Sequence, residues 1–66
     1  MAVLKVIEIM ANSDKGWEDA ANNAVSHAAR SVKNIRSVYV KEQSATVKNG
    51  AIDNYRVNVK ITFEVD

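Results

Sequence analysis

The segment from Tyr55 to Val65 constrains the fold more than any other part of this chain. Polar and apolar side chains alternate there at every position. The apolar set is Tyr55, Val57, Val59, Ile61, Phe63 and Val65, and the polar set is Arg56, Asn58, Lys60, Thr62 and Glu64. Strict period-two alternation is typical of a strand with one buried face and one polar face. We therefore predict a strand over residues 55–65 with one side against a core.

Two further elements precede it. Residues 3–10 are dense in β-branched and aliphatic side chains and predict a strand that is apolar on both faces. A break follows, and Asn12 or Ser13 would cap the first N–H groups of a helix. The helix is expected to run to about Lys33 and to stop at Asn34, because its apolar residues recur at helical spacing. They are Trp17, Ala20, Ala21, Ala24, Val25, Ala28 and Val32.

A hairpin is predicted after the helix. Residues 36–47 predict a strand, and the following Lys48-Asn49-Gly50 contains Asn-Gly, a strong signal for a tight hairpin turn. The helix returns the chain, so the first two strands run the same way and the third runs opposite to both. A central third strand then gives an α+β fold of β-α-β-β type. Its three-stranded antiparallel sheet has the order 1-3-2 and wraps on one long helix.

The small size of the chain predicts self-association. Its 66 residues include no Cys and one His, so neither disulfides nor a thiolate or His-rich metal site can supplement so small a core. One helix is also too small to cover both faces and both edges of a long three-stranded ribbon. A closed homo-oligomer would cover them. We expect a single domain over residues 1–66 that works as a subunit of such an oligomer.

Composition and motifs exclude several classes of function. Nine Lys and Arg against eight Asp and Glu do not favour nucleic-acid binding. The apolar runs are too short for a membrane span, and no signal-peptide pattern opens the chain, which favours a cytoplasmic location. His27 has no evident partner for acid–base chemistry and is expected at the surface, so we do not expect an enzyme. Trp17, Tyr39 and Tyr55 are expected to pack against the sheet.

Three stretches carry a family resemblance: KVIEIMANS near the start, GWEDAANNAVSHAARSVKNI through the helix, and YRVNVKITFEVD at the end. Together they resemble dodecins over nearly the whole chain. The resemblance implies the β-α-β-β plan and assembly into a hollow, spherical homododecamer. It also implies a flavin site in many members, where flavins bind in pairs.

Two positions depart from the flavin-binding members. The resemblance implies a Trp that stacks on the flavin ring where this chain has Ser37, and a Gln that bonds the ring edge where it has Arg56. An aromatic pair contributes about 0.5–1.5 kcal/mol beyond the area it buries, and Ser37 offers no such stacking. With Trp17 early in the helix, the pattern resembles a non-flavin branch described as calcium-binding. Glu42 takes the place of an acidic residue near the family's ligand pocket.

Three hypotheses for the function follow. The first is a non-enzymatic homo-oligomer that binds or stores a small ligand or ion, with calcium as a candidate and Glu42 as its metal contact. The second is that a flavin, riboflavin or FMN, still binds in an altered pose, with Ser37 and Arg56 at the cofactor positions and Arg56 facing the ring edge or the phosphate. The third is a purely structural or partner-binding oligomer.

Overall fold

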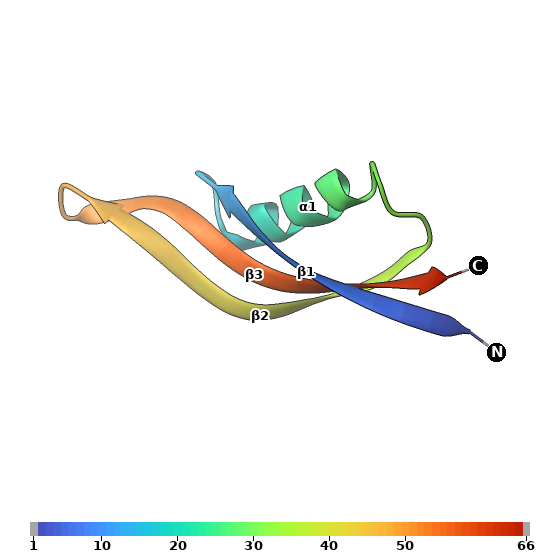
Figure 1. Cartoon of the computed structure of the whole chain (residues 1–66). Coiled ribbons are helices and arrows are strands. Elements are labelled where there is room, and N and C mark those ends of the chain that lie inside the picture. The colour runs from blue at the N-terminus through green and yellow to red at the C-terminus, as the bar shows by residue number, and fades with distance from the viewer. Residues whose placement is uncertain (1, 66) are drawn as a thin grey trace.

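The computed structural model describes residues 2–65, which form one helix and three strands (Figure 1). The elements in chain order are β1 (Val3–Ser13), α1 (Trp17–Ala28), β2 (Ile35–Lys48) and β3 (Ala51–Val65). β3 pairs antiparallel with both β1 and β2, so the sheet order is β1-β3-β2. The predicted α+β fold with the third strand in the centre is confirmed.

The core lies between α1 and the sheet. The helix contributes small side chains and the central strand contributes β-branched ones, and both sets are buried. The buried apolar residues are Ala20, Ala24, Ala28, Val57, Val59 and Ile61. Each buried Val or Ile side chain contributes about 1.5–3 kcal/mol to folding. Because the helical residues are Ala, the helix can lie close to β3, and this is the buried face that the alternation of β3 predicted.

The helix ends earlier than predicted. α1 stops at Ala28 instead of continuing to Lys33. Beyond it, the N–H groups of Arg30 and Ser31 bond to carbonyl oxygens three residues back, at 3.2 and 3.0 Å, which tightens the last turn. Asn34, predicted as the helix stop, has a φ of 62° and lies in the connection to β2. Within residues 2–65 no helix has the length and apolar character needed to cross a membrane.

The start of the helix also differs from the prediction. The expected break at residues 11–13 is instead the last part of β1, which stays paired with β3. Gly16 occupies the N-cap position, and no side chain caps the helix. Ser13 acts just before it: its Oγ accepts the N–H of Lys15 at 2.9 Å and donates to Asp19 Oδ2 at 2.6 Å. The buried Ser13 therefore fastens the end of β1 to the first turn of α1.

The β2–β3 hairpin projects beyond the rest of the molecule (Figure 1). β1 ends at Ser13, opposite Tyr55, so residues 46–54, which we call the arm, have no β1 beside them. The turn of the arm is Asn49-Gly50, with φ values of 53° and 77°, as the two-residue turn predicted from Asn-Gly requires. The chain is therefore elongated, with principal extents of 51 × 19 × 13 Å.

Candidate functional site

The three predicted site residues lie on the side of the sheet turned away from α1, which we call the far face. Residues directly opposite each other on antiparallel strands share a face, and successive residues alternate between faces. Because Val57 and its alternates are buried under α1, Arg56, Asn58 and Thr62 point to the far face. Ser37 pairs with Thr62 and Glu42 pairs with Asn58, so both share that face with Arg56.

These residues do not form one cluster within a chain. Ser37 lies opposite Thr62, six positions along β3 from Arg56, which corresponds to about 20 Å at the usual rise of a strand. Glu42 lies between them, opposite a residue only two positions from Arg56. A small molecule could therefore not contact Ser37 and Arg56 of the same chain together. A site that uses both positions needs more than one copy.

Arg56 is held in a defined position. Its Nε donates a hydrogen bond to Asn12 Oδ1 at 2.9 Å, which ties β3 to the end of β1. The side chain of Asn12 is at the surface and Arg56 is half-buried. The guanidinium has further N–H groups in a fixed, planar arrangement, and these suit an anion or a carbonyl oxygen.

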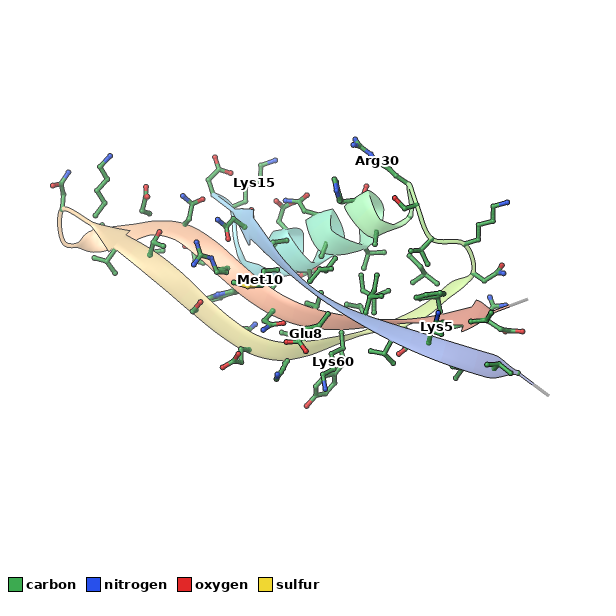
Figure 2. All side chains as sticks on the ribbon, viewed as in Figure 1. Lys5, Glu8, Met10, Lys15, Arg30 and Lys60 are labelled. Carbon is green, nitrogen blue, oxygen red and sulfur yellow. The ribbon has the colours of Figure 1, made fainter. Side chains whose placement is uncertain are left out.

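A polar row crosses the middle of the far face. Lys41 Nζ on β2 pairs with Glu8 Oε2 on β1 at 3.3 Å, across the central strand. A hydrogen bond from the side chain of Asn58, and then one from Lys41, holds the pKa of Glu8 below its ordinary value of 4.5. Figure 2 shows Glu8 and Lys60, which pair across β1 and β3, on the side of the sheet away from α1. The Glu8 carboxylate is therefore ionised at neutral pH and already has partners.

Asn58 has one polar atom without a partner. Its Oδ1 is buried and accepts no hydrogen bond from the described residues. A buried acceptor without a donor costs about 1–3 kcal/mol. The cross-strand neighbour of Asn58 is Glu42, one of the predicted site residues. A cation or a donor group supplied from outside the chain would be stabilised at this position.

One chain does not make a complete metal site. Among residues 2–65, no three His, Asp or Glu side chains come together closely enough to hold a metal ion. Glu42 and the amide oxygen of Asn58 are the oxygen donors that the register brings side by side. Both are of the hard type that calcium prefers, but calcium takes six to eight oxygen ligands. They could supply only part of such a shell.

The remaining residues singled out in the sequence have other positions. Trp17 packs against the core, as predicted: its ring meets that of Tyr55 edge-on at 4.9 Å, and its Nε1 donates to the carbonyl oxygen of Ser44 at 2.8 Å. His27 is exposed on α1, as predicted. Tyr39 is not packed within its own chain, because 64% of it is exposed.

Sequence reasoning missed Asn58 and Lys41 as members of the far-face row. The alternation in β3 places Asn58 on the polar face, but it does not show which residue of β2 lies opposite. The register shifts at an irregularity between Val40 and Glu42, and this shift brings Glu42 beside Asn58. No local signal in the sequence marks that irregularity.

The fold and site can be compared with known proteins. The sequence profile of the dodecin family matches residues 3–66. The chain belongs to the dodecin family. The family resemblance inferred from the sequence is therefore confirmed.

Among dodecins, the calcium dodecin of Mycobacterium tuberculosis is 38% identical over 65 residues, which are 98% of this chain and 92% of that protein. A crystal structure described as the calcium-chelating immunodominant antigen calcium dodecin from M. tuberculosis, with a novel calcium-binding site, is 40% identical. It has a TM-score of 0.83 and covers 97% of this chain and 91% of that one. The dodecin from Streptomyces davaonensis is 25% identical, with a TM-score of 0.94, over 98% of this chain and 96% of that one.

Proposed function

We propose that this dodecin is a non-enzymatic homo-oligomer that binds a small ligand or ion, with calcium as the leading candidate and Glu42 as one of its ligands. Two findings support calcium: the 38% identity to a relative named calcium dodecin, and the pairing of Glu42 with Asn58 on the far face. The unsatisfied Oδ1 of Asn58 carries the proposal, because a bound cation beside Glu42 would satisfy it.

Assembly belongs to the same proposal. A calcium ion needs more oxygen ligands than Glu42 and Asn58 supply, so neighbouring copies would complete the shell. The far face also carries apolar side chains at the surface of a single chain, with Leu4, Val6 and Met10 each more than half exposed. A homo-oligomer would cover them, and the homododecamer implied by the family resemblance is the form that we propose.

A modified flavin site is the second candidate. Ser37 supplies no ring for stacking, which weakens a flavin site of the usual family type. Arg56 favours the alternative, because its position is fixed by Asn12 and its remaining N–H groups suit a ring carbonyl or a phosphate. A flavin held in this way would depend on charge and hydrogen bonds more than on stacking.

Calorimetric titration with calcium chloride tests the first candidate. We expect the parent protein to bind calcium and Glu42→Gln to bind it at least tenfold more weakly, because the substitution removes a charged oxygen ligand; tenfold corresponds to about 1.4 kcal/mol. Glu18→Gln is the matched control, since Glu18 is exposed on α1, away from the far face. Calcium affinity that is equal in Glu42→Gln and parent would refute the role of Glu42, and no binding to the parent would refute calcium.

A flavin titration separates the second candidate from the first. Apo-protein is added to riboflavin or FMN, and flavin emission is followed. We expect little quenching by the parent, because Ser37 removes the stacking partner. Quenching at micromolar or lower protein concentration, lost in Arg56→Ala, would instead establish the altered flavin pose. Binding of neither calcium nor flavin would favour a structural or partner-binding oligomer.

A further inference from the structure

We infer that the arm joins copies of this chain, with Val47 and Ile52 of one copy packed into a groove between β1 and α1 of another. The inference rests on the homo-oligomer of the proposed function. It adds which two surfaces meet, and it does not depend on which ligand is bound.

The arm carries an apolar pair that its own chain leaves uncovered. Val47 and Ile52 are cross-strand partners, and they are 69% and 50% exposed. The other residues of the arm are polar or small: Thr46, Lys48, Asn49, Gly50, Ala51, Asp53 and Asn54. Neither α1 nor β1 extends over this part of the hairpin (Figure 1). Full burial would contribute about 1.5–3 kcal/mol for each of the two side chains, so the pair favours an external partner.

The groove offers a matching apolar surface on the body of the chain. It has a volume of about 520 Å³ and is lined by Ile9, Met10, Ala11, Asn23, Ala24 and His27. Met10 at its rim is 61% exposed, and an unbranched thioether adapts its shape to an incoming side chain. β1 is an edge strand, so backbone groups along its outer side are available to an incoming strand. The groove therefore suits a β-structured element with apolar side chains.

The exposed area of the chain supports a second copy as the partner. A folded monomer of 7.3 kDa is expected to expose about 4,200 Å². This chain exposes 4866 Å², which is about 700 Å² more. A standard protein interface covers about 800 Å² on each partner. The excess is therefore close to what one partner would cover.

The positions of the two surfaces explain how the contact can repeat. The arm and the groove lie on the same chain but are different surfaces. A contact between them is heterologous, and such contacts generate rings when the rotation closes. Each copy would then give its arm to one neighbour and receive the arm of another.

Charge exchange at the two surfaces tests the inference. Ile52→Lys places a cation on the arm, and Met10→Glu places an anion at the rim of the groove. Molar mass is measured by light scattering on a size-exclusion column, at one protein concentration and low salt. We expect each single variant to shift from the mass of the parent assembly toward the 7.3 kDa of one chain. The double variant is expected to recover most of the parent mass, because the new Lys and Glu would face each other across the interface.

The controls separate this inference from the assembly itself. Lys48→Gln changes the charge of the arm without touching its apolar pair and should keep the parent mass. The inference is overturned if either single variant keeps the parent mass, or if the double variant remains as small as the single ones. A parent that is itself monomeric overturns the homo-oligomer of the proposed function and this inference with it. Recovery in the double variant also shows that the single substitutions did not simply unfold the chain.

Discussion

At the scale of single residues, Asn58 connects the parts of the far face. Its amide N–H side stabilises the Glu8 carboxylate, while its Oδ1 remains buried without a donor. The same side chain thus fixes one charged group and leaves an acceptor beside Glu42. A hydrophobic residue at this position would keep the strand but remove both effects.

The titration of Glu8 tests this role. The pKa of Glu8 is lowered first by the hydrogen bond from Asn58 and then by Lys41. We expect Asn58→Leu to raise the pKa of Glu8 toward its ordinary value of 4.5, as measured by NMR of the side-chain carboxyl carbon. Lys60→Met is the control, because Lys60 has the smallest effect on this carboxyl and its loss should move the pKa less.

The sign of the pH dependence follows from the direction of this shift. Because the pKa of Glu8 is lower in the folded chain than in the unfolded one, its contribution to stability is complete above about pH 4.5 and is lost as the pH falls through the folded-state value. Glu8→Gln should therefore flatten the acid limb of the stability curve. A larger pKa change in Lys60→Met than in Asn58→Leu would contradict the assignment.

At the scale of elements, the close contact of helix and sheet depends on the three buried Ala residues. Ala24, in the middle of α1, is only 2% exposed and faces the β-branched core of β3. A longer side chain at that position has no free volume on the sheet side. The contact is therefore sensitive to added methylene groups more than to lost ones.

An overpacking substitution tests this contact. Ala24→Leu should lower the free energy of unfolding by about 1–3 kcal/mol, because the larger side chain must push α1 away from the sheet or leave its preferred rotamer. Urea unfolding of parent and variant at equal protein concentration measures the change. Ala29→Leu is the control, since Ala29 is exposed just after the helix. Equal stability of Ala24→Leu and the parent would mean that this face of α1 is not packed as described.

The elements also show how far the sequence predicts the fold. The alternation in residues 55–65 and the Asn49-Gly50 turn are local patterns, and each gave the correct strand or turn. The end of α1 was wrong because the stretch from Ala29 to Lys33 has a helix-compatible pattern, while the backbone tightens after Ala28. The end of β1 was wrong because residues 11–13 are held by pairing with β3, which is distant in the sequence.

At the scale of the whole molecule, function and assembly cannot be separated. Ser37 and Arg56 share a face but lie about 20 Å apart along the sheet, and Glu42 lacks enough oxygen neighbours in its own chain. The sequence predicted the types of residue at these positions through the family resemblance. It did not predict their separation, because that depends on the register of two strand pairs. Loss of the oligomer would therefore also remove the ligand site, even if every chain stayed folded.

The position of Trp17 has a practical consequence. It is the only Trp in the chain, and its indole joins α1 to Tyr55 and Ser44, at the base of the arm. Any movement of the hairpin relative to the helix must change the polarity around this ring or break its hydrogen bond. The protein therefore contains its own optical probe, and its ultraviolet emission can follow the docking of the hairpin in real time without a label.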